Sequence, residues 1–89
     1  MAERTLHIQN KLGLHARASA RFVSEASRFA SEITLLKDGM EVNAKSIMGI
    51  MMLAAGKGTS LTLRAVGKDE QLALDAIEAL VNDRFGEGE

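Results

Sequence analysis

The feature that most constrains the fold is the spacing of the hydrophobic residues, which changes between two periods along the chain. Residues 4–9, RTLHIQ, alternate between polar and apolar side chains, with Leu6 and Ile8 on one face. This alternation is typical of a half-buried β-strand. From Ala16 to about Ala30 the hydrophobic residues recur three or four positions apart, which predicts an amphipathic helix. Its apolar stripe consists of Ala18, Phe22, Ala26 and Phe29.

Turn signals divide the remaining chain into three strands and two helices. The strands are expected at residues 32–37, 40–44 and 60–66, and the helices at residues 46–53 and after Asp69. Asp38-Gly39 is a strong tight-turn signal, so the strands at residues 32–37 and 40–44 are expected to form a hairpin. The Gly-Lys-Gly at residues 56–58 is expected to end the short helix, and Asp69 to cap the long one. The long helix has one apolar face, made of Ala73, Leu74, Ile77, Leu80, Val81 and Phe85.

The predicted order βαββαβα indicates an α+β fold. Strands that alternate in polarity favour a four-stranded antiparallel sheet with one wet face, so the helices are expected to pack on the other face. With 89 residues, the chain is expected to form a single domain spanning residues 1–89.

Composition excludes several classes of function. The chain has no cysteine, which rules out disulfides and thiolate metal sites, and its net charge of -1 gives no reason to expect a nucleic-acid partner. It contains neither a signal-like segment nor a run of about 18 apolar residues, so we expect a cytoplasmic protein without membrane insertion.

The stretch KLGLHARASARF, residues 11–22, is the strongest candidate for a functional site. Gly13 permits an unusual backbone conformation, and His15 falls at or next to the N-cap of the first helix. The unpaired amides of that helix start favour an anion, and Arg17 adds a cation on the same turn. These positive surroundings favour a neutral, nucleophilic ring that could accept a phosphoryl group. On spacing alone, a loop histidine without such a role remains the alternative.

The short helix carries the second candidate. Ser46 is expected to be its N-cap, and a helix of this length cannot bury all of Met48, Met51 and Met52. These methionines would form either a small hydrophobic cluster beside the core or an adaptable docking patch.

Two further features have simpler interpretations. His7 lies on the polar face of the first strand, without an acidic or cysteine partner at metal-ligand spacing, so it is expected to be a solvated residue and no metal site is predicted. The GKGT at residues 56–59 lacks the upstream glycine of a phosphate loop and is interpreted as a helix C-cap and turn.

Two motifs, NKLGLHARASA and AKSIMGIMMLAAGKGT, resemble the histidine-containing phosphocarrier (HPr) family of the bacterial phosphotransferase system. The resemblance covers essentially the whole chain and implies an open-faced β-sandwich without a cofactor. It implies that the protein is a carrier rather than an enzyme. His15 would accept a phosphoryl group from enzyme I and pass it to enzyme II A domains.

The resemblance also implies roles for other residues. Arg17 matches the active-site arginine, with the Ala16 and Arg17 amides holding the phosphoryl oxygens. Ser46 matches the serine phosphorylated by an HPr kinase/phosphorylase in some members, and the docking residues would be Ile47, Met48 and Met51. The protein is expected to be a monomer.

One position departs from the family pattern, and several alternatives stay open. Ala18 replaces the proline usually found three residues after the histidine, yet the helical turn is expected to survive because alanine is an excellent helix former. The alternatives are the nitrogen-related regulatory branch of the family, a non-catalytic partner module with an idle histidine, and an ACT-like domain that binds small molecules.

Overall fold

The computed structural model describes residues 1–88 and has the predicted order of elements. The strands are β1 (Ala2–His7), β2 (Glu32–Lys37), β3 (Met40–Asn43) and β4 (Ser60–Val66). The helices are α1 (Ala16–Ala26), α2 (Ile47–Met52) and α3 (Glu70–Asn82), followed by a 3₁₀ turn, η1 (Arg84–Gly86). In the part of the chain that is described, no helix has the length and apolar character needed to cross a membrane.

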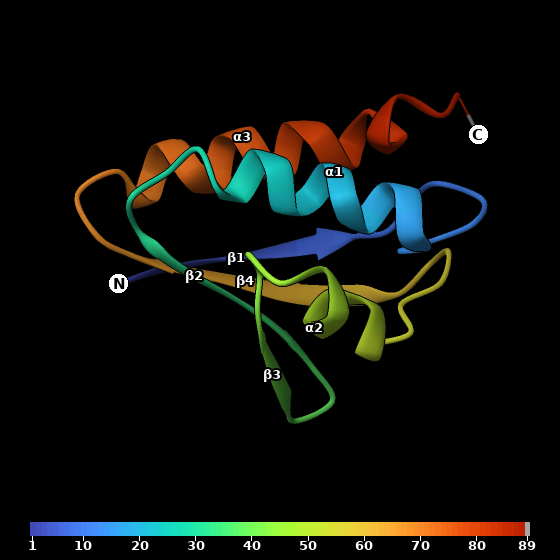
Figure 1. The fold of residues 1–89 in the computed structure, drawn as a ribbon, viewed down its shortest axis with the longest axis horizontal. Helices are drawn as coiled ribbons and strands as arrows, with labels where there is room; N and C mark the ends of the chain where they lie inside the picture. The colour runs from blue at the N-terminus through green and yellow to red at the C-terminus, as the bar shows by residue number, and fades with distance from the viewer. Residues whose placement is uncertain (89) are drawn as a thin grey trace.

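The four strands form one antiparallel sheet in the order β1-β4-β2-β3. Its register places Leu6 opposite Leu61 and Leu35 opposite Leu63, so the apolar positions of neighbouring strands fall on the same face. Helices α1 and α3 lie side by side over that face, and the opposite face is open (Figure 1). The predicted α+β class and open-faced sandwich are confirmed.

The core lies between the sheet and these two helices. From the strand side it includes Leu6, Ile33, Leu35, Leu61, Leu63 and Ala65, all at most 3% exposed. From the helix side it includes Ala18, Phe22, Ala26, Ala73, Leu74, Ile77, Val81 and Phe85. Burying a leucine- or phenylalanine-sized side chain contributes about 1.5–3 kcal/mol each, so these two faces fix how α1 sits on the sheet.

Helix α1 is shorter than the sequence predicts. It ends at Ala26 rather than near Ala30, with Ser27 as its C-cap, although Phe29 still packs against the core from the following turn. The amides of Ala30 and Ser31 donate to the carboxylate of Asp69, at 2.8 and 3.0 Å. A side-chain acceptor thus takes donors that a longer helix would use internally.

Asp69 is the N-cap residue of α3 by position, but its side chain does not cap α3 within the described chain. It accepts from Ala30, Ser31 and the Ser31 hydroxyl instead, and so ties the β4–α3 turn to the segment before β2. The hydrogen bond from the Ser31 hydroxyl, followed by the one from the Ala30 amide, lowers the pKa of Asp69 below its ordinary value.

Three smaller boundaries also differ. The first strand spans Ala2–His7 rather than residues 4–9, although the Ile8 amide continues the pairing by donating to Thr59. Helix α2 ends with Leu53 as its C-cap and Ala54 at φ +50°, so residues 56–58 are a later turn and not the C-cap. Phe85 is buried, but it lies in η1 beyond the end of α3.

The Asp69 contacts predict a specific acid sensitivity. Because the folded-state pKa is lowered, the stabilisation is present above the ordinary value of 3.8 and is lost as the pH falls through the folded-state pKa. Denaturant titrations of the parent should therefore lose free energy of unfolding as the pH falls below about 4. Asp69→Asn should be less stable at neutral pH and should lack this part of the loss. Asp83→Asn, at an exposed position, should behave as the parent does; an unchanged acid profile in Asp69→Asn would contradict the assignment.

Candidate functional site

His15 is the N-cap residue of α1, as the sequence predicts. Its backbone is extended, with φ -74° and ψ 178°, and its carbonyl accepts the first helical hydrogen bond from Ser19 at 2.8 Å. Ala16 and Arg17 therefore occupy the first two helical positions, where backbone amides lack partners inside the helix. The helix begins as expected with Ala18 in place of proline, and Ala18 is fully buried.

The loop before His15 is held against the chain that follows α2. Gly13 has φ +67°, and a Cβ at this position would lie 2.7 Å from the Cα of Gly56 and closer still to the carbonyl oxygen of Ala55. The same carbonyl accepts from the Leu14 amide at 2.8 Å. Only glycine fits both the conformation and the space, so Gly13 fixes where the chain enters α1.

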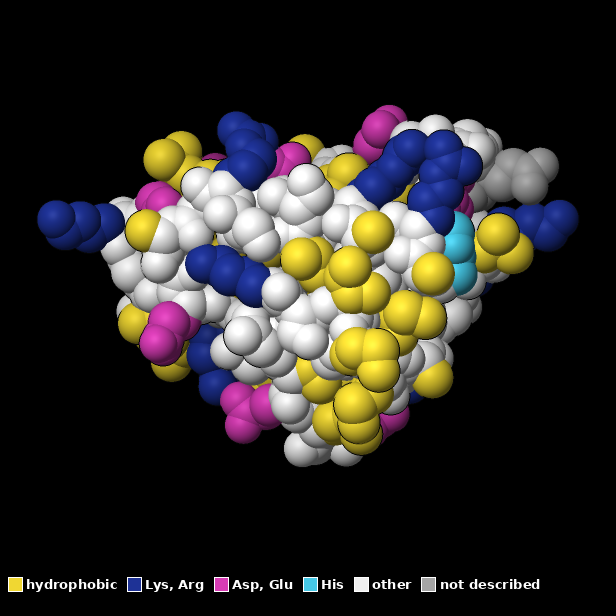
Figure 2. All heavy atoms as spheres, in the orientation of Figure 1, with side chains coloured by type: hydrophobic (Ala, Val, Ile, Leu, Met, Phe, Trp, Pro, Cys, Tyr) yellow, Lys and Arg dark blue, Asp and Glu magenta, His cyan; other side chains and the backbone are white. Residues whose placement is uncertain are grey.

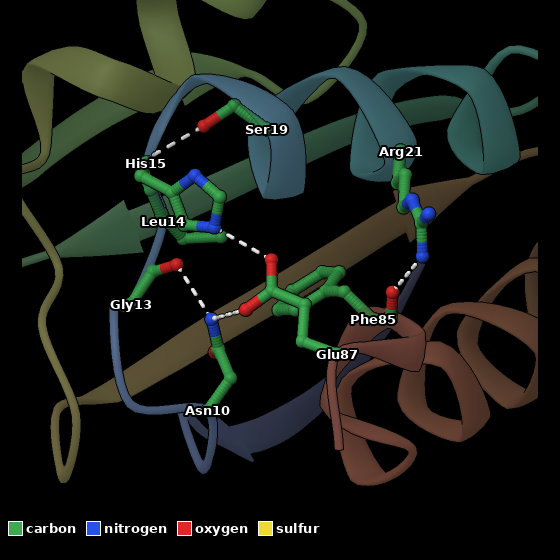
Figure 3. A network of polar contacts seen from close by, with 8 residues as sticks. All are labelled: Asn10, Gly13, Leu14, His15, Ser19, Arg21, Phe85 and Glu87. Carbon is green, nitrogen blue, oxygen red and sulfur yellow. Dashed lines mark hydrogen bonds and ion pairs between the residues drawn. The ribbon is translucent and has the colours of Figure 1, made fainter. Parts of the chain in front are cut away.

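A carboxylate lies beside the histidine ring, which the sequence analysis did not anticipate. His15 Nε2 is 2.6 Å from Glu87 Oε2, and Asn10 Nδ2 donates to Glu87 Oε1 at 3.0 Å (Figure 3). The helix start and Arg17 predict purely positive surroundings for His15. This prediction is wrong, because a carboxylate lies beside the ring. The second ring nitrogen, Nδ1, points away from Glu87 on the side of the ring that faces the start of α1 (Figure 3).

His15 borders an open pocket of about 310 Å³. The pocket is lined by Lys11, Leu12, His15, Arg17, Gly86 and Glu87. Arg17 is exposed, and with Lys11 it brings positive charge to the pocket wall. A group that is partly exposed, next to cationic side chains and helix-start amides, can meet an anion arriving from solvent.

Ser46 is the N-cap of α2, as predicted. Its hydroxyl oxygen accepts from the Gly49 amide at 3.1 Å, and its carbonyl accepts from Ile50. The hydroxyl is thus a structural cap at the base of the exposed apolar helix.

Most apolar side chains of α2 are exposed, as the length of the helix requires. We call Ile47, Met48, Met51 and Met52 the α2 patch; their exposed fractions are 42%, 75%, 42% and 66%. Ile50 is the α2 side chain that turns into the core. Figure 2 shows the hydrophobic side chains gathered over α2, with a histidine surface next to them. Leu12, 67% exposed, extends apolar surface to the His15 pocket.

The remaining candidates have no part in this site. His7 lies on the open face of the sheet, where its Nδ1 is 2.9 Å from the Ser60 hydroxyl. Lys57 is exposed in a turn in which the Gly58 amide donates to Ile8 and the Thr59 amide to Gly56. Among the described residues, no group of His, Asp or Glu side chains could hold a metal ion.

Sequence reasoning missed Glu87, Asn10 and Leu12. Glu87 is 72 residues from His15, and no local pattern announces such a contact. Asn10 lies in a turn-rich segment, where asparagine is common for local reasons. Leu12 carried a usable signal, because an apolar residue in a polar loop beside His15 has to be either buried or exposed for contact.

Known proteins share both the sequence and the fold. Residues 2–83 match the model of the family described as PTS HPr component phosphorylation site. The chain is 55% identical over 89 residues to a phosphocarrier protein HPr from Cupriavidus necator, with all of both chains covered. It is 52% identical to an HPr-like protein Crh from Halalkalibacterium halodurans, over 91% of this chain and 96% of the relative.

A solved structure agrees with these relatives. The crystal structure of HPr-C-His from Thermoanaerobacter tengcongensis superposes with a TM-score of 0.94 at 50% identity and covers 98% of each chain. The open-faced sandwich and the match to a phosphorylation-site family define the class of small phosphocarrier proteins. Within that class, the chain belongs to the HPr family of the phosphotransferase system. Membership excludes the ACT-like alternative.

The role of Gly13 can be tested against a matched glycine. Gly39 has φ +83° but no atom within 4 Å of an added Cβ, so Gly39→Ala carries backbone strain alone, roughly 1 kcal/mol. Gly13→Ala adds a collision with backbone atoms, for about 1–3 kcal/mol more. Denaturant unfolding should show Gly13→Ala to be clearly the less stable variant. Equal losses would mean that the approach to Ala55 and Gly56 does not constrain the loop.

Proposed function

We propose that this chain carries a phosphoryl group on His15, accepting it from enzyme I and passing it to enzyme II A domains. The observation that carries the proposal is the position of the histidine as N-cap of α1, beside an open pocket, in a chain of the HPr family. The protein is a carrier and not an enzyme, because the group that it binds leaves again on the next partner. We propose that it acts as a monomer.

In this proposal each part of the site has a task. The nucleophile is Nδ1, since Nε2 faces Glu87. A phosphoryl group on Nδ1 would point its oxygens at the α1 start, where the Ala16 and Arg17 amides donate and the Arg17 guanidinium balances the charge. Arginine suits this task because its planar fork can bind two oxygens at once.

The α2 patch would dock the partners. Ile47, Met48 and Met51 present a flexible apolar surface next to the histidine, and methionine side chains adapt to partner surfaces of different shape. One patch could therefore serve both the donor and the acceptors, which must bind one after the other at the same histidine.

Ser46 would carry regulatory phosphorylation by an HPr kinase/phosphorylase. Its phosphate would sit at the start of α2, where negative charge is favourable for the helix, and directly beside the apolar patch, where it is unfavourable for docking. The fold would persist while partner affinity falls.

The central assignment predicts that His15→Ala abolishes phosphorylation by enzyme I and phosphoenolpyruvate. His7→Ala should be labelled as the parent is, because His7 lies on the open face of the sheet and outside the pocket. Intact mass measurement after incubation reports the added phosphoryl group, which should be acid-labile as expected of a phosphoramidate. Labelling that persists in His15→Ala would refute the assignment, and an unlabelled parent would favour a partner module with an idle histidine.

The regulatory assignment predicts opposite behaviour in two Ser46 variants. Ser46→Asp keeps a capping oxygen, so its circular dichroism should match the parent while its phosphorylation by enzyme I slows. Ser46→Ala loses the bond to the Gly49 amide, for about 1 kcal/mol of stability, remains a good acceptor at His15 and is refused by the kinase. Ser60→Asp, exposed in β4, controls for added charge. Kinase labelling of Ser46→Ala equal to that of the parent would overturn the regulatory role.

A further inference from the structure

The contact between Glu87 and His15 is the feature of the site that the proposed function does not yet use. Glu87 bridges two residues, with one carboxylate oxygen 2.6 Å from His15 Nε2 and the other 3.0 Å from Asn10 Nδ2 (Figure 3). The Glu87 side chain is only 14% exposed, and that of His15 is 28% exposed. The pair therefore lies largely out of solvent, where a charged hydrogen bond is stronger than on an open surface.

The chain after α3 is shaped so that Glu87 reaches the ring. Phe85 is fully buried, and the centroid of its ring lies 6.5 Å from the centroid of the Phe22 ring. The Arg21 guanidinium donates to the Phe85 carbonyl. Arg84 and Phe85 have φ values of +53° and +55°, a region that side-chain-bearing residues rarely adopt. Such conformations persist where the surroundings enforce them, and here the enforced turn brings the chain back to the start of α1.

Asn10 holds the other carboxylate oxygen. It is fully buried, and its Nδ2 donates both to the Gly13 carbonyl at 2.8 Å and to Glu87. Its own Oδ1 is buried without a hydrogen-bond partner in the described chain. The reversed amide would set Oδ1 against two acceptors, so the orientation seen is the one that positions Glu87.

We propose that Glu87 is a positioning residue for phosphoryl transfer, which acts by accepting a hydrogen bond from His15 Nε2–H. The proposal rests on the function proposed above. The carboxylate fixes the ring tautomer, so that the proton is on Nε2 and the lone pair is on Nδ1. A buried carboxylate that orients a histidine in this way is a general device of nucleophilic sites.

The charge of Glu87 also matters during the transfer. The Nδ1 lone pair forms the new bond to phosphorus while the bond from phosphorus to the donor breaks, and the donor keeps that electron pair. The ring, still protonated at Nε2, thereby gains positive charge that the carboxylate stabilises. On delivery the P–N bond breaks and its electron pair returns to the ring, so the same contact serves transfer in both directions.

Glu87 is suited to remain ionised in this position. Burial acts to raise its pKa, but the hydrogen bonds that it accepts from Asn10 and His15, together with the positive charge of Arg17, lower the pKa below its ordinary value. The carboxylate is therefore present as an acceptor throughout the neutral range.

Two variants of Glu87 and one control test the proposal. Glu87→Ala removes the acceptor and the charge, and should lower kcat for phosphorylation by enzyme I roughly tenfold with little change in KM. Glu87→Gln keeps the size but loses the charge and one acceptor oxygen, so its kcat should lie between those of the parent and Glu87→Ala. Asp83→Asn removes the same charge from an exposed position just before η1 and should leave kcat unchanged.

A second readout separates positioning from mere stability. The Nε2 proton of His15 should give a slowly exchanging, low-field NMR signal in the parent and in Asp83→Asn, and Glu87→Ala should lose it. A parental kcat in Glu87→Ala overturns the proposal, as does a lowered kcat with the signal retained. Neither result touches the proposed function, which fails only if His15 is not the residue that is phosphorylated.

Discussion

The position of His15 depends on one close backbone approach, between Gly13 and the Ala55-Gly56 segment. The Leu14 amide donates to the Ala55 carbonyl at this point, and the missing Cβ of Gly13 makes the approach possible. Because the contact joins the loop before α1 to the chain after α2, it links the histidine to the helix that carries the α2 patch. On the other side, the contact between Phe22 in α1 and Phe85 in η1 holds the chain that follows α3 against α1. Three separate segments therefore converge on the start of α1.

Most of the fold follows from local spacing, whereas the predicted end of α1 is wrong for a reason that lies far away in the sequence. Strand alternation, the helical stripe of α1 and the Asp38-Gly39 turn each predict their element because burial on one face is enough to set the period. The predicted end of α1 is wrong because the Ser31 amide donates to Asp69, which lies 38 residues after Ser31. A distant side chain competes there with helix propensity, and such competition leaves no trace in the local pattern.

The residues of the candidate site also fall into two groups, those that local sequence predicts and those that only a distant contact brings together. His15, Arg17 and Ser46 stand at helix starts, and helix starts have sequence signatures, so their places could be predicted. Glu87 and Asn10 become neighbours only because η1 turns the chain back over the start of α1. Local sequence accordingly predicts positive charge alone around His15, whereas the structure places a carboxylate on one side of the ring and leaves the other side facing the helix (Figure 3).

The most direct test of this account is to ask which nitrogen of His15 carries the phosphoryl group. Protein labelled with ¹⁵N in its histidines can be phosphorylated by enzyme I and phosphoenolpyruvate, and the phosphorus–nitrogen coupling then identifies the bonded atom. Our expectation is phosphorus on Nδ1 and a proton on Nε2, because Nε2 faces Glu87 and Nδ1 faces the start of α1 (Figure 3). Phosphorus on Nε2, or on any residue other than His15, would contradict it.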